Sequence, residues 1–257
     1  MRRFHVLCAA LALALLHSLA LPGAAKAADS EAVAAVKAGA DCVKCHLEQA
    51  DFAGADLAGR NLGGAFLDGA SFAGANLEGA NLAGASLARA DFSNARLAGA
   101  QFVIANLVEA NFDGADLKGA VVSSARLTLA TFRKVEAAGA TFARSRMRGV
   151  DFTGSSIEGA SFAGAKAPAS IFDKIAGAGA IFRKSGLAGA FFRDARIEGA
   201  DFWSADLWKA DLSGAETAGT DFTRAHLRIA TLPASIQHAN LCRATLPDGS
   251  ASRQGCN

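Results

Sequence analysis

Residues 71–90 read SFAGANLEGANLAGASLARA, which is four consecutive blocks of five residues with nearly the same composition. A large apolar residue recurs at every fifth position, as at Phe72 and Leu77, and the residue two positions before it is small. The pattern runs from Leu47 to Leu232 over 38 blocks, whose central residue is Leu in sixteen and Phe in fourteen. A repeat this regular has to be interpreted before any other feature of the chain.

Neither a helix nor a plain strand can use this period. Five residues advance about 500° around a helix, so successive central residues would form no stripe. A period of five also alternates between the two faces of a strand. Within one block, however, the small residue and the central residue are two apart and point the same way. Each block can therefore form three extended residues followed by a turn, and glycines such as Gly54 and Gly84 suit that turn. This predicts a chain that coils with the small residue and the central residue of each block pointing inward.

The positions of Phe indicate how many sides the coil has. Eight Phe residues follow one another at a spacing of 20, and they form the predicted core ladder: Phe52, Phe72, Phe92, Phe112, Phe132, Phe152, Phe172 and Phe192. A second series, from Phe142 to Phe222, is offset by ten. A 20-residue turn of four sides places the two series on opposite walls. About nine to ten coils stacked at ~4.8 Å would make a rod roughly 45 Å long.

Blocks such as ADFAG, ANLEG and ADLWK resemble the A(D/N)LxG repeats of the pentapeptide-repeat family over about 200 of the 257 residues. The resemblance implies an all-β solenoid, a right-handed quadrilateral parallel β-helix. It does not imply a function, because one fold serves many roles. The family also resembles inhibitors that protect DNA topoisomerases by imitating nucleic acid. That role is a disfavoured alternative here, because an N-terminal signal peptide would direct the chain away from the cytoplasm and the net charge of the mature chain is too weak to imitate DNA.

The N-terminal segment, residues 1–27, has the features of a secretory signal peptide. A basic start at Arg2 and Arg3 precedes an apolar run that is shorter than the ~20 residues of a spanning helix, and Ala25-Lys26-Ala27 fits a cleavage site. The sequence therefore predicts a periplasmic or secreted protein whose mature chain has no membrane span. An N-terminal membrane anchor is the alternative.

The mature chain divides into three expected parts. Residues 28–41 suit a short capping helix with Asp29 or Ser30 as its N-cap. Residues 42–246 form the repeat coil, in which the phase slips by one near the C-terminus so that Leu241 becomes a central residue. Residues 247–257 form a polar tail. Both ends of a solenoid need such caps, because they would otherwise expose unpaired backbone.

The charge and the histidines restrict the function. The mature chain carries 23 basic and 24 acidic residues, a net charge of −1, which favours neither nucleic-acid binding nor nucleic-acid mimicry. The mature chain has only three histidines, His46, His226 and His238, and Asp221 is the acid nearest to His226 in sequence. No catalytic constellation or metal site stands out. We therefore expect a non-catalytic binding or scaffolding protein whose partner is another protein, with room for an end-to-end homodimer.

The outward positions supply a candidate partner surface, which consists of Arg126, Arg146, Arg148, Lys166, Trp203 and Trp208. Three of its cations share one column at a spacing of 20, and such a column could attract a phosphate, a carboxylate-rich partner or anionic lipid. The alternative is a solvated face neutralised by Glu109 and Asp151. The aromatic residues, with Phe66 and Phe191, either form an interface or lie flat over neighbouring coils.

The sequence CVKCH, residues 42–46, has two interpretations. Cys42 and Cys45 fall on a central and a small position of the repeat, so the favoured interpretation is two structural cysteines at the first coil, either as a disulfide or as free thiols. The alternative is a redox protein with covalently attached c-type haem on Cys42, Cys45 and His46, because the motif is complete. A haem needs an apolar pocket, whereas the coil is already filled. We therefore expect no cofactor.

Two further cysteines lie near the C-terminus. Cys242 follows the central residue Leu241 and points outward, and Cys256 lies in the polar tail. Disulfides are compatible with an exported chain. We expect these two cysteines to pair and to hold the tail over the last coil.

Overall fold

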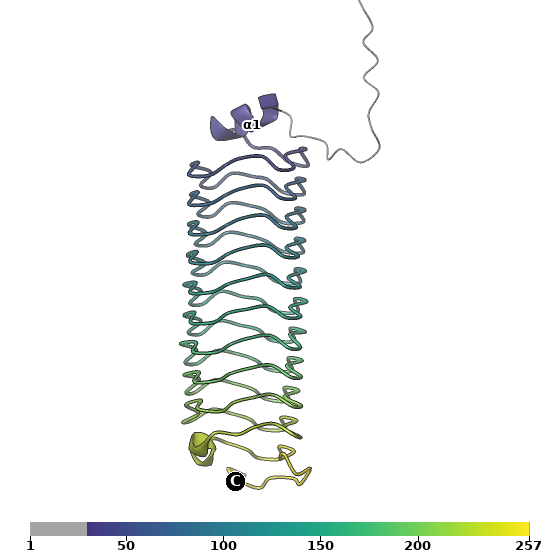
Figure 1. Cartoon of the computed structure of the whole chain (residues 1–257), viewed down its shortest axis with the longest axis vertical. Coiled ribbons are helices and arrows are strands. Elements are labelled where there is room, and N and C mark those ends of the chain that lie inside the picture. The colour runs from purple at the N-terminus through teal and green to yellow at the C-terminus, as the bar shows by residue number, and fades with distance from the viewer. Residues whose placement is uncertain (1–29, 257) are drawn as a thin grey trace, which may run out of the picture.

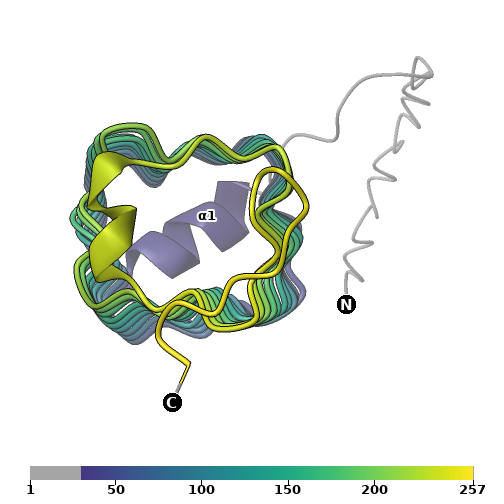
Figure 2. The same ribbon diagram turned by 90° about the horizontal axis from the view of Figure 1, so that it is seen from below.

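The computed structural model describes residues 30–256, so the predicted signal peptide lies outside the described residues. The chain winds around one axis into a four-sided rod (Figures 1 and 2). Parallel bridges join the residue before each central position to its counterpart 20 residues further on, from His46↔Phe66 to Asp211↔Thr231. This register is the one that a 20-residue turn of four blocks requires.

Each wall of the rod consists of one block per coil. Wall A contains residues 50–54 and their equivalents at intervals of 20. Walls B, C and D contain residues 55–59, 60–64 and 65–69, respectively, and their equivalents at intervals of 20. The block 45–49 precedes 65–69 on wall D. Figure 2 shows the four walls end-on.

Every block ends in the same turn. On wall A the N–H of Ala55 donates to the carbonyl of Phe52 at 3.0 Å, and the turn residue Gly54 has a positive φ of 64°. The same turn position is filled by Ile104 and Ile229 with φ of 57° and 62°. Positive φ is strained for a β-branched residue, so the repeating turn geometry overrides local preference at these two positions.

The core consists of the inward side chains of all four walls. The rings of Phe52 and Phe72 stack at 5.3 Å and those of Phe72 and Phe92 at 4.9 Å, which confirms the predicted ladder on wall A. Rings from wall C meet this ladder edge-on, as Phe102 does against Phe92 at 5.6 Å and 89°. The quadrupoles of aromatic rings favour both edge-to-face and offset stacked pairs, and together these pairs fill the interior.

A few small inward positions carry a hydroxyl instead of Ala, and each has partners. The Oγ of Ser155 donates to the carbonyl of Phe132 at 2.6 Å and accepts the N–H of Val135 at 3.1 Å. It thereby bridges the two ends of the turn one coil back. Buried polar groups persist where such bonds satisfy them.

The N-terminal end of the rod is covered by helix α1 (Ser30–Lys37), which lies within the predicted capping segment. Figure 2 shows α1 lying across the end of the coil, and Val36 is buried there against the first core residues. The carbonyl of Gly39, just after the helix, accepts a bond from the Arg60 guanidinium. Asp29, one of the two expected N-caps, lies outside the described residues.

The C-terminal end combines a phase slip with a returning tail. The 3₁₀ helix η1 (Ala234–His238) replaces one block of wall B, and the next bridges join residues 19 apart, as in Asp221↔Asn240. The predicted slip by one is therefore confirmed.

None of the helices in residues 30–256 is long and apolar enough to cross a membrane.

The tail pairs with the last coil instead of extending into solvent. It runs antiparallel to that coil, so the N–H of Leu241 donates to Gln254 at 3.1 Å and that of Arg243 to Ser252 at 3.0 Å. The predicted disulfide between Cys242 and Cys256 is present. The tail thus occupies backbone groups that a bare solenoid end would leave unpaired.

Candidate functional site

The candidate site lies on the outside of the rod, because the inward side chains are packed together. A shallow pocket of about 300 Å³ lies on the outer face of wall B, lined by Glu158, Ala178, Arg196 and Glu198 among others. In residues 30–256 no group of three or more His, Cys, Asp or Glu side chains could hold a metal ion. His226 pairs with Asp206 at 3.1 Å and not with Asp221, the nearest acid in sequence.

The predicted cationic column is present on wall D. Bridges join Arg126 to Arg146 and Arg146 to Lys166, and Arg148 lies two residues further along the same wall. All four side chains are exposed. Within residues 30–256 none of them takes part in an ion pair. Cations on adjacent coils about 4.8 Å apart repel one another unless an anion lies between them.

The structure does not support the alternative in which Glu109 and Asp151 neutralise this column. Asp151 accepts two bonds from Thr153, one from its N–H and one from its hydroxyl. Neither acid forms an ion pair with any cation in the part of the chain that the structure describes.

Sequence reasoning missed a fifth cation beside the column. Arg144 is exposed at the turn between walls C and D and lies over Gly164, with its Cγ 3.6 Å from the position of a Cβ there. Together with Arg146 and Arg148 it places three guanidinium groups on one coil. The alternation of Arg in RSRMRG was the signal that could have revealed it.

The two tryptophans of the candidate surface lie differently. The ring of Trp203 is half-buried between Lys184 and Arg224, whose charged groups lie 5.2 and 5.8 Å from it. Trp208 is 42% exposed. Trp203 is therefore held by cations from neighbouring coils, whereas Trp208 is available to a partner.

Two other outward aromatics also lie against neighbours. The ring of Phe66 stacks on His46 at 4.7 Å, and the guanidinium of Arg193 lies 4.9 Å from the ring of Phe191. Phe66 therefore covers the adjacent coil, whereas Phe191 is covered by a cation of its own block.

The first coil favours the interpretation of CVKCH as structural cysteines. Cys42 and Cys45 form a disulfide, and Cys42 is buried in the first layer of the core. The Nδ1 of His46 lies 3.0 Å from the Glu48 carboxylate while its ring stacks on Phe66. Haem attachment needs both sulfurs for thioether bonds, so these residues as arranged do not fit a haem.

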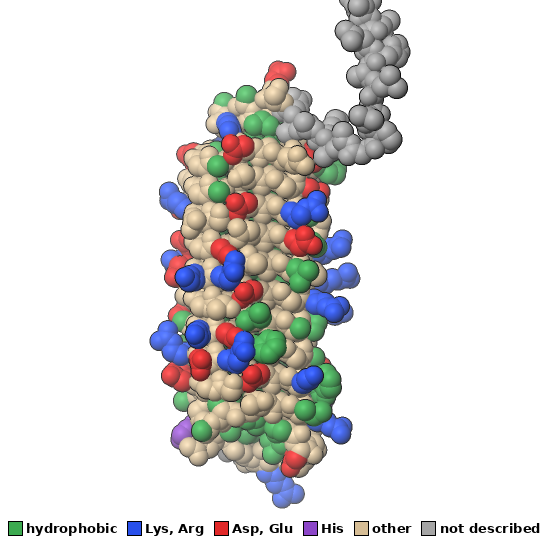
Figure 3. Space-filling model, in the orientation of Figure 1, with side chains coloured by type: hydrophobic (Ala, Val, Ile, Leu, Met, Phe, Trp, Pro, Cys, Tyr) green, Lys and Arg blue, Asp and Glu red, His purple; other side chains and the backbone are tan. Residues whose placement is uncertain are grey.

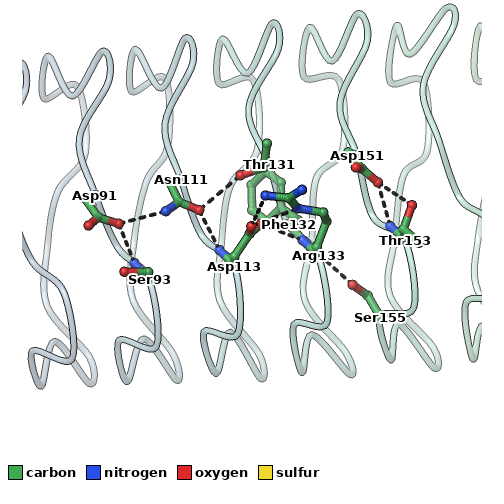
Figure 4. A network of polar contacts seen from close by, with 10 residues as sticks. All are labelled: Asp91, Ser93, Asn111, Asp113, Thr131, Phe132, Arg133, Asp151, Thr153 and Ser155. Atoms are coloured by element: carbon green, nitrogen blue, oxygen red, sulfur yellow. Dashed lines mark hydrogen bonds and ion pairs between the residues drawn. The ribbon is translucent and has the colours of Figure 1, made fainter.

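Wall A shows how the repeat satisfies charges elsewhere (Figure 4). Asn111 donates to Asp91 at 3.0 Å, and Asp113 accepts the backbone N–H and the Nε of Arg133 at 3.0 and 2.8 Å. Burial raises the pKa of Asp113, but the hydrogen bonds from Arg133 and Thr131 and the Arg133 charge outweigh it, so the pKa lies below its usual value. These residues tie successive coils together.

A carboxyl pair lies on wall B, where the sequence gave no sign of it. Glu216 shares a hydrogen bond with Glu198, one coil back, and this bond and the Glu198 charge raise the pKa of Glu216 above its usual value. Residues 18 apart become neighbours only through the coil.

We expect Glu216→Gln to raise the thermal midpoint at neutral pH. A carboxyl with a raised pKa binds its proton more tightly in the folded state, so its contribution to stability falls as pH rises from its usual range through the raised value. The substitution removes the repulsion between the carboxylates of Glu216 and Glu198. The gain should vanish below the usual carboxyl range, and calorimetry across pH tests this. Glu136→Gln, in the same column, is the control, and an equal gain there would contradict the pairing.

Comparisons with known proteins agree on the repeat. The family model described as "Pentapeptide repeat region" matches residues 85–162. The family model described as "Pentapeptide repeats (8 copies)" matches residues 38–69, 50–87 and 190–228. No curated protein matches. Among solved structures, HetL from the cyanobacterium Nostoc, a pentapeptide repeat protein involved in heterocyst differentiation regulation, is 25% identical over 88% of this chain and 99% of its own, with a TM-score of 0.41.

Two further solved structures are similar. A trypsin-treated form of QnrB1, a plasmid-mediated fluoroquinolone resistance protein, is 23% identical over 72% of this chain and 89% of its own, with a TM-score of 0.44. A pentapeptide repeat protein from the thylakoid lumen of Arabidopsis thaliana is 30% identical over 44% of this chain and 65% of its own, with a TM-score of 0.18.

Proposed function

The chain belongs to the pentapeptide-repeat family, and its repeat directs two of every five side chains into the core. We propose that it is an exported, non-catalytic docking module. It holds a larger partner against the outside of a rigid rod. The observation that carries the proposal is the cationic column on wall D: Arg126, Arg146 and Lys166 are exposed and, among the described residues, unpaired. On wall A, by contrast, Arg133 and Arg193 form ion pairs with Asp113 and Asp173 one coil back.

Mimicry of nucleic acid remains the weaker alternative. Double-stranded DNA carries one negative charge per about 1.7 Å, which is about 26 charges over a rod of roughly 45 Å. Walls A and B together carry 14 acidic and seven basic residues between positions 45 and 229. That excess falls several-fold short of the charge of DNA.

Capture from a cell-envelope extract tests the docking function. The immobilised mature chain is expected to retain a defined component, protein or lipid, that mass spectrometry identifies. Arg126→Ala, Arg146→Ala and Lys166→Ala combined should lower this capture at least ten-fold while shifting the melting temperature little, because exposed side chains contribute little to stability.

Cys42→Ser is the matched control and should leave capture intact. An absorption spectrum of the same preparation checks the haem alternative. If capture survives the three surface substitutions and instead depends on Cys42, Cys45 or His46, the docking proposal is wrong.

A further inference from the structure

The charges of the rod are sorted by wall, although the whole chain is nearly neutral. Between residues 45 and 229, walls C and D carry 12 basic and six acidic residues, whereas walls A and B carry seven basic and 14 acidic residues. Walls C and D are adjacent, so one half of the rod is basic and the other half is acidic.

Ion pairing is sorted in the same way. On walls A and B, four of the seven cations are in ion pairs, and these are Arg96, Lys118, Arg133 and Arg193. On walls C and D, Arg183 is the one cation of twelve that pairs within the described stretch 45–229. The unpaired cations run along the rod from Arg60 to Arg228.

The exposed large apolar side chains lie on the same basic half. Among residues 30–256 there are six. Five belong to wall C or D, and they are Phe66, Ile104, Leu129, Trp208 and Ile229; the sixth, Val43, lies beside the first block of wall C, to which Cys42 and Lys44 donate backbone hydrogen bonds. In Figure 3, Lys and Arg side chains project along both edges of the face shown, and hydrophobic groups gather near its C-terminal end.

We propose that walls C and D dock on an anionic lipid bilayer, an inference that rests on the proposed docking function and names its partner. Anionic headgroups attract basic residues near the surface, and Trp and aliphatic side chains enter the interface between headgroups and acyl chains. A bilayer is a continuous sheet of charge, which suits cations spread along the whole rod. It also accounts for the apolar groups being on the basic half alone.

A second copy of the chain explains these observations less well. Its acidic half would complement the cations, but among the described residues walls A and B expose no large apolar side chain. Such a side-by-side contact would also be heterologous, so every open assembly of copies would still leave a basic half and an acidic half uncovered. An acidic protein would be expected to contact a compact patch with a few dominant residues, whereas the cations here are distributed.

Vesicle flotation with the full mature chain tests the proposal. Vesicles of phosphatidylglycerol and phosphatidylcholine in equal parts are expected to bind the protein, and vesicles of phosphatidylcholine alone should bind it at least ten-fold more weakly. The combined variant Arg126→Gln, Arg146→Gln, Arg148→Gln and Lys166→Gln should weaken binding roughly 600-fold, because each cation near such a surface contributes about five-fold.

The matched control removes four cations from walls A and B: Lys118→Gln, Lys134→Gln, Lys174→Gln and Arg196→Gln. It changes the net charge equally and should weaken binding by a few-fold at most. Trp208→Ser with Leu129→Ser should reduce the binding that persists at high salt, where charge attraction is screened.

Three results would overturn the inference. The first is that the protein fails to float with the mixed vesicles. The second is that the control loses as much binding as the wall D variant, which would show a response to net charge alone. A self-association of the lipid-free protein that the wall D variant abolishes would assign the surface to a second copy. If vesicles fail while capture of an envelope protein still depends on Arg126, Arg146 and Lys166, the docking function stands without the lipid.

Discussion

Phe112→Ala is expected to lower the free energy of unfolding by about 3–5 kcal/mol. The Phe112 side chain is fully buried, and its ring stacks on Phe92 at 4.8 Å and on Phe132 at 4.5 Å while Phe102 meets it edge-on at 5.8 Å. The neighbouring coils are fixed by hydrogen bonds, so they cannot collapse into the cavity. Denaturant unfolding followed by circular dichroism measures the loss.

Phe66→Ala is the matched control for this prediction. Phe66 is 41% exposed on wall D and contacts His46 on one side, so its removal creates no closed cavity. We expect a loss of about 1 kcal/mol or less for an exposed site away from the core. A Phe112 variant as stable as the Phe66 variant would show that the stacked rings are not the main source of stability.

Removal of the C-terminal disulfide by Cys242→Ser with Cys256→Ser is expected to cost about 3 kcal/mol. The bridge closes a loop with a sequence separation of 14 and holds the tail on the last coil. Without it, the tail should detach and the amides of Leu241 and Arg243, which donate to the tail, should exchange rapidly with solvent. Hydrogen exchange and denaturant unfolding of the purified variant measure both effects.

The disulfide between Cys42 and Cys45 provides the comparison, because its sequence separation is only 3. A shorter loop loses less entropy on closure, so Cys42→Ser with Cys45→Ser should cost less. Unchanged exchange at Leu241 and Arg243 in the Cys242 and Cys256 variant would mean that backbone pairing alone holds the tail.

The sequence by itself determined the period, the inward side chains and the number of walls. A five-residue block repeats its own geometry, so one block predicts the next, and the spacing of 20 between Phe52 and Phe72 reveals the turn. The capping helix, the phase slip and the pairing of Cys242 with Cys256 were also predicted, because each lies where a regular pattern stops.

Only the tertiary structure decided which outward charges are free. Coiling brings residues 18 or 20 apart into contact, and whether they pair then depends on the reach and the sign of both side chains. Arg133 finds Asp113 one coil back, whereas Arg146 has Arg126 and Lys166 as its two neighbours. The net charge of the chain averages over these contacts. The basic and apolar half therefore emerges only when the four walls are compared in space.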